Sequence, residues 1–337
     1  GCMGSTASIG WFTAAAIEPV AQVRTLALIE LVFVYVVSHR FFREKIAPRE
    51  ITGMLLLALI VVYPIGKLLW NSFYDMRLSG ERAGTFVGWE NYALVLKDSD
   101  FWNATGNTVF ITLITVPGAL VVGMALAMLA NLPFRRKWPV RLALLLPWAL
   151  PLSFAGLIFA WFFHTEYGVV NDALRLLGFS QEPVMWLLRP SLAMAAICLT
   201  IIWKSSSFMA LILLAGLQMI PRSLYEAAEV DGASRWQQFW QITVPMLMPS
   251  IIVALIFRTI TALQTFDIPY TMTKGGPGNA TETLAMLIHK HTIDYSDIGM
   301  GSTLAVCLFL SILIRYGQPL RPLMFALLGV ALVVRSL

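Results

Sequence analysis

Long apolar runs separated by short polar segments dominate the chain. They cover residues 51–71, 105–131, 140–163, 190–219, 249–270 and 298–315. Each run has about the twenty residues that an α-helix needs to cross a hydrocarbon core of roughly 30 Å. A transmembrane β-barrel would instead show strands of roughly ten residues with alternating polarity. The pattern therefore predicts an all-α, polytopic membrane protein with a core of six spanning helices.

Two further apolar segments lie near the ends of the chain. Residues 25–38 form an apolar run that is at most long enough to cross the hydrocarbon core once, and it includes Glu30. Because basic residues at 40–49 follow this run, it is a candidate extra helix that enters from outside, with an interfacial helix as the alternative. Residues 322–334 are too short to span comfortably and predict an interfacial segment. The expected organisation is an N-terminal extension (1–49), a transmembrane domain (50–316) and a short tail (317–337).

Lysine and arginine residues set the orientation of these helices. They precede the first run, lie between the second and third and between the fourth and fifth, and follow the sixth: Arg40, Arg43, Lys45, Arg49, Arg135, Arg136, Lys137, Arg141, Arg222, Arg235, Arg315 and Arg321. Six helices threaded in order place all of them on one side, which the positive-inside rule identifies as the cytoplasm. The segment 221–248 is therefore predicted to be cytoplasmic.

Composition and charge exclude several classes of protein. Of the 337 residues, 58% are hydrophobic and 13% charged, and the mean hydropathy is +0.73, whereas about a quarter of the residues of a soluble domain are charged. The net charge of +5 comes from residues beside the apolar runs, so no nucleic-acid partner is implied. The three cysteines share no short spacing, and His289 and His291 would lie on different faces of a helix. We therefore expect no metal site and interpret both histidines as solvated loop residues.

The cytoplasmic segment 221–248 predicts a helix, a sharp turn and a second helix parallel to the membrane. Good helix formers follow Pro221 up to Asp231, and Gly232 is the expected left-handed stop. Ser234 and Gln237 have the spacing of a capping box for the second helix. One apolar face of that helix would carry Trp236, Phe239 and Trp240. The sequence predicts that this helix ends at Pro245 and Pro249, before the next span.

Residues 226–245, EAAEVDGASRWQQFWQITVP, resemble the EAA loop in permeases of binding-protein-dependent ABC importers. The pattern of that loop is Glu-Ala-Ala, three residues, Gly, nine residues, Ile, one residue, Leu and Pro. It is matched by Glu226, Ala227, Ala228, Gly232, Ile242 and Pro245, and Val244 replaces the usual leucine. Permeases of that family dock on their ATPase through a coupling helix, and the loop of this chain is similar to it. The resemblance implies an ATPase-coupling site formed by Glu226, Ala227, Ala228, Asp231, Gly232, Ile242 and Pro245.

Residues 50–316 resemble the subfamily that imports sugars and glycerol phosphates, in particular the maltose/trehalose-type first permease. Segments such as LPWALPLSFAGLIFAWFFHTEYGVVND and FDIPYTMTKGGPGNATETLAMLIHK carry this resemblance. It implies a multi-pass protein of the bacterial inner membrane that works in a complex. The implied partners are a second permease subunit in a heterodimer, a dimer of ATPase subunits, an extracytoplasmic sugar-binding protein and the membrane lipid.

The glycine-rich segment KGGPGN at 274–279 lacks the Walker spacing of a phosphate-binding loop and is predicted to be a turn on the external side. We therefore expect no ATP hydrolysis and no other catalysis by this chain. The expected cofactors, ATP and magnesium, would be bound by the partner subunits.

Polar residues inside the spans are candidates for the transport path, because charges in hydrocarbon are costly and usually face a cavity or a partner. Trp203, Thr261, Gln264 and Thr265 are predicted to contact a sugar by ring stacking and hydrogen bonding. Lys204 and Arg258 lie beside them in the fourth and fifth spans. The alternative is that these two cations snorkel or pair with the second permease, and that the hydroxyl groups hold helices together.

The sequence thus predicts the permease subunit of an ATP-driven importer of di- or oligosaccharides. A permease of the same fold for glycerol phosphate or another solute is the nearest alternative. An ion-coupled secondary transporter would need intramembrane acids, and the spans have almost none beyond Asp267. A membrane enzyme would show clustered carboxylates or a pair of metal-binding histidines, which the sequence lacks.

Overall fold

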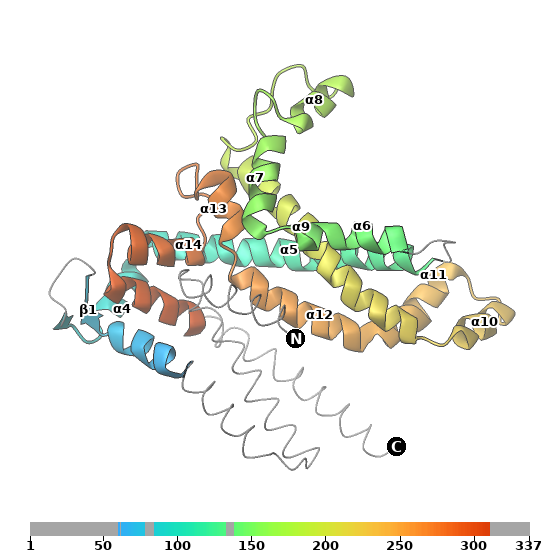
Figure 1. The fold of residues 1–337 in the computed structure, drawn as a ribbon, viewed down its shortest axis with the longest axis horizontal. Coiled ribbons are helices and arrows are strands. Elements are labelled where there is room, and N and C mark those ends of the chain that lie inside the picture. Colours follow the sequence, from blue (N-terminus) through green and yellow to red (C-terminus); the bar gives the residue numbers. More distant parts are fainter. Residues whose placement is uncertain (1–59, 61, 78–83, 133–137, 311–337) are drawn as a thin grey trace, which may run out of the picture. The chain divides into compact units, whose positions relative to one another are not determined.

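Helices form most of the structure, a computed structural model that describes residues 60, 62–77, 84–132 and 138–310 (Figure 1). The predicted N-terminal extension, the tail, residues 51–59 and 61 of the first run and residues 311–315 of the sixth run lie outside the described residues. The chain divides into two units, residues 99–286 and residues 1–98 with 287–337. Each unit is described by itself.

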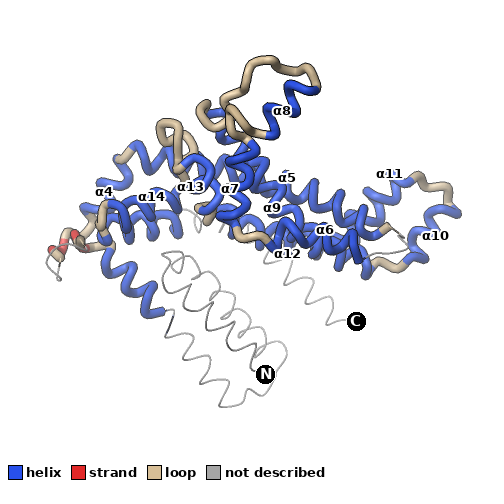
Figure 2. Tube along the Cα trace, turned by 45° about the horizontal axis from the view of Figure 1, so that its top comes forward, coloured by secondary structure: helices blue, strands red, loops and turns tan. Residues whose placement is uncertain are grey.

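The larger unit is a bundle of long apolar helices. Three helices of the described part are long and apolar enough to cross a membrane: Ser99–Asn131, Pro190–Met219 and Arg235–Leu263. The first, α5, has 33 residues and is about 50 Å long, and it begins earlier than the predicted residue 105. The second, α9, has the predicted bounds of the fourth span. Both lie side by side with α12 (Val244–Leu263) in Figures 1 and 2.

Small residues allow α5 and α9 to approach closely. Ala119, Gly123 and Ala127 recur every four residues on α5 and are buried. A Cβ atom at Gly123 would lie 2.6 Å from Met209 Cβ and 3.0 Å from the Ser206 carbonyl oxygen of α9. Spacing of this kind brings helix backbones into contact in membrane proteins, where dispersion contacts take over from the hydrophobic effect.

Hydroxyl groups inside α5 are satisfied within the helix or by its neighbours. Thr108 Oγ1 donates to the Ala104 carbonyl oxygen at 2.8 Å, and Thr112 Oγ1 donates to the Thr108 carbonyl oxygen at 2.8 Å. Thr108 Oγ1 also accepts a hydrogen bond from the Leu284 amide at 2.9 Å. Threonine can therefore be buried in these apolar spans at low cost, and it also joins distant segments.

The predicted third span, 140–163, is two helices instead of one. α6 covers Trp138–Ala149 and α7 covers Leu152–Phe162. The break falls at Leu150 and Pro151, because proline disfavours the helical conformation of the residue before it and has no amide hydrogen to donate. The prediction of one unbroken span over residues 140–163 was therefore wrong.

The predicted fifth span, 249–270, has different ends, because the helix begins within the segment 221–248 that precedes it. α11 (Arg235–Gln238), the π-helical segment η3 (Phe239–Thr243) and α12 form one helix. Pro245 lies in the first turn of α12 directly after the π segment, where the wider turn tolerates a missing amide hydrogen. The predicted helix end at Pro245 and Pro249 was therefore wrong, and the span ends at Leu263.

Beyond α12 the chain turns back on itself. Helix α13 (Asp267–Thr273) packs against α7, and the glycine-rich turn follows. This turn lies against the start of α5, where Asn103 Nδ2 donates to the Asn279 carbonyl oxygen at 2.8 Å and Asn107 Nδ2 donates to the Glu282 carbonyl oxygen at 3.0 Å. The sequence prediction of a turn in this segment is confirmed.

The smaller unit contains a helix at 62–71, a short antiparallel hairpin of β1 (Tyr74–Asp75) and β2 (Thr85–Phe86), and α4 (Glu90–Lys97). The hairpin was not predicted. The 298–310 helix is anchored by Thr303 Oγ1, which donates to the Ser72 carbonyl oxygen at 3.1 Å. His289 ends α14 (Leu284–His289) and His291 lies in η4 (Lys290–Asp294), so the predicted loop histidines are helical.

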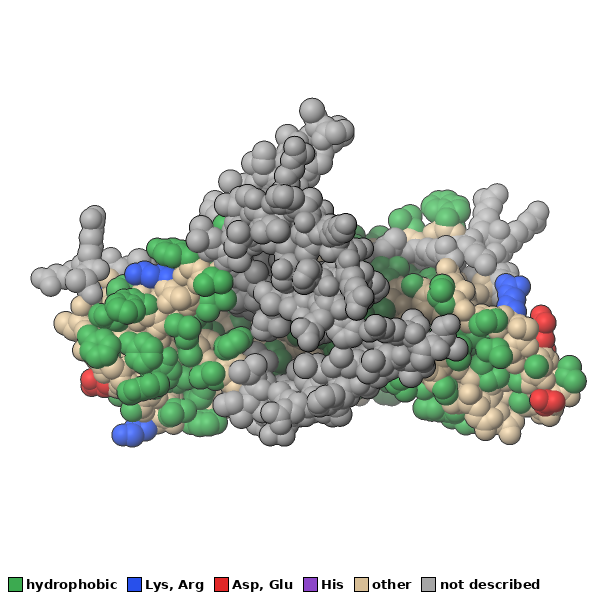
Figure 3. Space-filling view, turned by 90° about the horizontal axis from the view of Figure 1, so that it is seen from below, with side chains coloured by type: hydrophobic (Ala, Val, Ile, Leu, Met, Phe, Trp, Pro, Cys, Tyr) green, Lys and Arg blue, Asp and Glu red, His purple; other side chains and the backbone are tan. Residues whose placement is uncertain are grey.

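The lateral surface is apolar, as a lipid-facing surface requires. Large hydrophobic side chains are exposed along α5, α6 and α7, including Leu113, Val121, Leu142 and Leu157. On the face drawn in Figure 3, hydrophobic side chains cover most of the described surface and charged side chains are few. The described helices therefore have the surface of an integral membrane protein.

Candidate functional site

A helical turn at one end of the larger unit contains most of the residues of the predicted coupling site. α10 (Arg222–Val230) ends at Asp231, and α11 begins after Ser234 (Figure 1). Gly232 has a φ of +78°, the left-handed conformation that the sequence predicts. Its amide donates to the Glu229 carbonyl oxygen at 3.1 Å, and the Ala233 amide donates to the Ala228 carbonyl oxygen at 2.8 Å. These two bonds form a Schellman motif, which fixes the direction of the turn.

The second half of the turn is held by the predicted capping box. The Gln237 amide donates to Ser234 Oγ at 3.3 Å, and the Ser234 amide donates to Gln237 Oε1 at 2.8 Å. Gln238 Nε2 also donates to the Ala233 carbonyl oxygen at 3.2 Å. The backbone groups at the start of α11 are therefore satisfied by local side chains.

Tyr225 joins α10 to the long helix that follows. Its hydroxyl group lies 2.9 Å from Thr243 Oγ1 in η3, and its ring packs against the core shared by α5, α9 and α12. No residue of α10 is buried, and Glu226, Ala227, Asp231 and Gly232 are exposed. Ile242 is half-buried in η3 and Pro245 lies in α12, so these two residues belong to the long helix rather than to a loop. The turn is thus a preformed, solvent-exposed projection on a packed base.

A cavity of about 320 Å³ lies within the larger unit, lined by α6, α9, α12 and the start of α13. Three of the predicted path residues line it, namely Thr261, Gln264 and Thr265. Its wall also contains the aromatic residues Trp148, Phe208, Phe257 and Phe266 and the charged residues Lys204, Arg258 and Asp267. The volume lies at the lower end of the range for small-molecule sites, roughly 300–1,000 Å³.

Both cations of the cavity are held by groups of this chain. Arg258 Nη2 donates to Thr115 Oγ1 of α5 at 2.9 Å, and Arg258 Nη1 donates to Thr261 Oγ1 at 3.1 Å. Lys204 Nζ donates to the Trp148 carbonyl oxygen at 2.8 Å. Because both side chains are more than nine-tenths buried among helices, neither extends to the membrane surface, as the snorkelling alternative requires.

Trp203, the fourth predicted path residue, does not line the cavity. Its ring packs against Phe159 of α7, with 5.0 Å between the ring centroids. One helical position separates it from Lys204, which does line the cavity, so the contact of Trp203 with a sugar stays a prediction that this cavity does not support. The sequence prediction also did not include Trp148, which lies in the last turn of α6 just before the break at Pro151.

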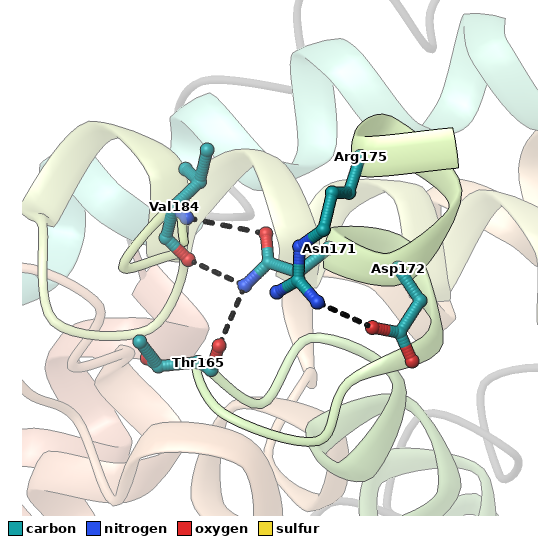
Figure 4. A network of polar contacts seen from close by, with 5 residues as sticks. All are labelled: Thr165, Asn171, Asp172, Arg175 and Val184. Atoms are coloured by element: carbon teal, nitrogen blue, oxygen red, sulfur yellow. Dashed lines mark hydrogen bonds and ion pairs between the residues drawn. The ribbon is translucent and has the colours of Figure 1, made fainter. Parts of the chain in front are cut away.

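The segment between α7 and α9, which lies apart from α10 in Figure 1, is held by a buried asparagine (Figure 4). Asn171, in α8 (Val169–Leu176), donates from Nδ2 to the carbonyl oxygens of Thr165 at 2.9 Å and Val184 at 3.0 Å. Its Oδ1 accepts from the Val184 amide at 3.2 Å and from Trp186 Nε1 at 2.9 Å. One side chain thus satisfies four groups and closes the segment into a defined loop.

We expect Asn171→Ala to loosen this loop by about 2–3 kcal/mol, because several polar groups lose their partner at once. Limited proteolysis of the purified protein would measure this as faster cleavage between residues 164 and 189. Asp172→Ala is the matched control. It removes an exposed ion pair with Arg175 at 3.6 Å, and such pairs contribute about 1 kcal/mol at most. Equal cleavage rates for both variants would contradict the role of Asn171.

Comparison with known proteins places this chain among transport permeases. The family described as "Binding-protein-dependent transport system inner membrane component" matches residues 119–317. The sulfoquinovosyl glycerol transport system permease protein SmoG of Agrobacterium fabrum is 64% identical over 76% of this chain and 82% of its own length. The trehalose/maltose transport system permease protein MalF of Thermococcus litoralis is 38% identical over 81% of this chain and 92% of its own length. A bacterial ABC transporter that imports the acidic polysaccharide alginate has a similar fold, with a TM-score of 0.67 at 20% identity over 86% of this chain and 98% of its own.

Proposed function

Since the chain belongs to the family of inner membrane components of binding-protein-dependent transport systems, we propose that it forms the sugar path of an ATP-driven importer and couples that path to a separate ATPase. Its relatives are sugar ABC transporter permeases, so the chain is an integral membrane permease of this class. The proposed location is the inner membrane of a bacterial cell. The proposed substrate is a sugar with the size of a disaccharide or glycoside.

The observation that carries the coupling proposal is the exposed turn between α10 and α11. Glu226, Ala227, Asp231 and Gly232 project into solvent on a turn that local hydrogen bonds make rigid. A helix that packs so little of its surface within its own chain is suited to insertion into a groove of a partner. We assign the partner as the ATPase subunit, which would bind ATP and magnesium.

One long helix links this turn to the cavity. The helix Arg235–Leu263 has 29 residues, so it is about 44 Å long. It begins at the turn and ends at the cavity, where Thr261 lies in its last turn and Gln264 follows it. A displacement of the turn on closure of the ATPase would move the cavity end of the same helix. This continuity supports a mechanism in which ATP-driven closure changes the access of the cavity to the two sides of the membrane.

The remaining proposed partners complete the transport cycle. A second permease subunit would cover the apolar side of the bundle and complete the path as a heterodimer. An extracytoplasmic binding protein would deliver the sugar to the loop around α8, where Leu176, Leu177 and Phe179 are exposed. Uptake of sulfoquinovosyl glycerol, trehalose and maltose by cells that express the whole gene cluster would test the substrate. Uptake of none of them would contradict the sugar assignment.

We expect Gln264→Ala to lower sugar uptake about tenfold while the complex still assembles, because a hydrogen bond to a sugar contributes about 1–1.5 kcal/mol. The measurement is initial uptake of the labelled substrate, with the amount of purified complex determined in parallel. Gln218→Ala, an exposed glutamine at the end of α9, is the control. Normal uptake by Gln264→Ala would remove this residue from the path.

A further inference from the structure

The cavity of the larger unit contains two positive charges, and neither forms an ion pair with a carboxylate of the described residues. Within those residues, the ion pairs join Arg77 to Asp75 and Arg175 to Asp172, far from the cavity in the sequence. Lys204 and Arg258 both line the cavity and are 7% and 5% exposed. Buried charges without a partner are costly, and in membrane spans they usually mark the path of a charged substrate or ion.

Arg258 is fixed in place and retains hydrogen-bonding capacity. Thr115 and Thr261 each accept one hydrogen bond from its terminal nitrogens, which sets the plane of the guanidinium group. Its Nε–H is buried and lacks a hydrogen-bond partner among the described residues. A guanidinium group has five N–H donors, so two neutral hydroxyl acceptors leave most of them available to an anion.

Lys204 is placed by the break between α6 and α7. The Trp148 carbonyl oxygen, which accepts from Lys204 Nζ, lies in the last turn of α6, where the chain leaves the helix before Pro151. That carbonyl group lacks the amide donor that a continued helix would supply. One of the three ammonium hydrogens satisfies it, and the other two remain for a ligand in the cavity.

Aromatic rings form the apolar part of the same wall. Trp148 and Phe208 are stacked with 6.4 Å between their centroids, and Phe257 meets Phe208 edge-on at 6.4 Å. Thr261, Gln264 and Thr265 add neutral polar groups. An aromatic wall with hydroxyl and amide groups is suited to a sugar ring, which has an apolar face and a polar rim.

We propose that this cavity is a binding site for an anionic sugar, in which Lys204 and Arg258 bind a carboxylate or sulfonate group while Trp148 and Phe208 stack on the sugar ring. The inference rests on the proposed function, because it places the cavity on the transport path. Asp267 also lines the cavity, but two cations and one carboxylate leave an excess of positive charge. Ser153 Oγ lies 3.3 Å from Asp267 Oδ1, and this carboxylate is an acceptor for sugar hydroxyl groups.

The competing source of negative charge is a carboxylate of the second permease subunit. The observations favour a ligand, because the cations are held by α5 and α6 of their own chain and border a space of about 320 Å³. A structural ion pair between subunits would leave no selectivity between charged and neutral sugars. Selectivity between charged and neutral sugars therefore distinguishes the two explanations.

The test uses proteoliposomes that contain the complete importer, with the second permease, the ATPase and the binding protein. Three glycerol glycosides with the same scaffold serve as probes: sulfoquinovosyl glycerol (a sulfonate), glucuronosyl glycerol (a carboxylate) and glucosyl glycerol (neutral). Initial uptake is measured for the native chain, Lys204→Met, Lys204→Arg and Arg258→Met. The same binding protein delivers each probe to the native chain and to the variants. Its preference among the sugars therefore cancels when uptake of one probe by a variant is divided by uptake by the native chain. Lys97→Met, which removes an exposed cation of α4, is the matched control.

We expect Lys204→Met and Arg258→Met to lower uptake of an anionic probe about 10- to 100-fold, as the loss of a charge-assisted hydrogen bond predicts. Uptake of the neutral probe should stay within about threefold of native, and Lys204→Arg should retain most of the anion uptake. A loss confined to the sulfonate or to the carboxylate identifies which anion the site accepts. Equal loss for all probes, or reduced assembly in both methionine variants and in Lys204→Arg, would overturn the anion site and indicate a structural role.

Failure of the anion site can be told apart from failure of the proposed function. If the native complex imports the neutral glycoside and neither anionic one, the chain is still a sugar permease and only the anion site is overturned. If the native complex imports no probe, and no sugar of the wider panel, the importer assignment itself fails and the anion site fails with it.

Discussion

Gly232→Trp is expected to abolish association of the permease with its ATPase subunit. The glycine has a φ of +78°, so a side chain at this position costs about 1–2 kcal/mol of backbone strain and distorts the turn between α10 and α11. Because a Cβ atom there would meet nothing within 4 Å, the indole would project from the turn into the partner. Recovery of the ATPase with the tagged permease should fall at least about tenfold, with a similar loss of uptake. Quantitative co-purification measures the first effect directly.

Gly178→Trp is the matched control for this prediction. Gly178 follows α8 with a φ of +75°, has nothing within 4 Å of its Cβ position and belongs to a turn with the same hydrogen bonds. It lies in the loop around α8, apart from α10 in Figure 1. The substitution should therefore impose the same strain and leave ATPase recovery at the native level. Equal recovery with Gly232→Trp, or equal loss with Gly178→Trp, would contradict a docking role for the α10–α11 turn.

The second large effect is expected from Gly123→Leu, at the contact of α5 and α9. The new Cβ atom would lie 2.6 Å from Met209 Cβ and 3.2 Å from the Ala210 amide nitrogen, and a helix backbone cannot move aside locally. Overpacking of this kind destabilises by about 3 kcal/mol. The midpoint of thermal unfolding in detergent should fall by roughly 6–12 °C.

Gly106→Leu tests whether this effect comes from the helix contact rather than from the change of residue type. Gly106 is on the same helix, is exposed and has nothing within 4 Å of its Cβ position. We expect the midpoint of this variant to stay close to that of the native protein. A similar midpoint for both leucine variants would contradict close packing of α5 on α9 through Gly123.

The features that the sequence predicted well are the ones set by neighbouring residues. The left-handed Gly232 and the capping box of Ser234 and Gln237 depend on a few positions of local chemistry, and both occur as predicted. The bounds of α9 follow from Pro190 at its start and from a long, largely apolar run. Local backbone preferences and hydrophobic length are therefore sufficient to place these elements.

Prolines in the long helices could not be judged from local preference alone. Pro151 lies at a break between two helices, whereas Pro245 and Pro249 lie inside one, and the π-helical segment Phe239–Thr243 precedes them. That segment is held from outside by Tyr225, which bonds to Thr243 across the turn. Pro117 and Pro147 also lie inside helices, so the presence of a proline does not by itself predict a break.

The cavity was only partly predictable for a similar reason. Thr261, Gln264 and Thr265 were identified as polar residues at the end of one span, but Trp148 and Phe208 come from two other helices. Their approach depends on the break at Pro151 and on the packing of α6 against α9. Helical periodicity also could not separate Trp203 from Lys204, because the orientation of α9 is set by its neighbours.

The most direct test of the account is uptake by proteoliposomes that contain this chain with the second permease, the ATPase and the binding protein. Labelled sulfoquinovosyl glycerol, trehalose and maltose are supplied outside, and ATP is either present or absent on the side of the ATPase. We expect one of these sugars to accumulate only when ATP and the loaded binding protein are both present. Accumulation driven by a proton or sodium gradient in the absence of ATP would contradict it and identify an ion-coupled transporter.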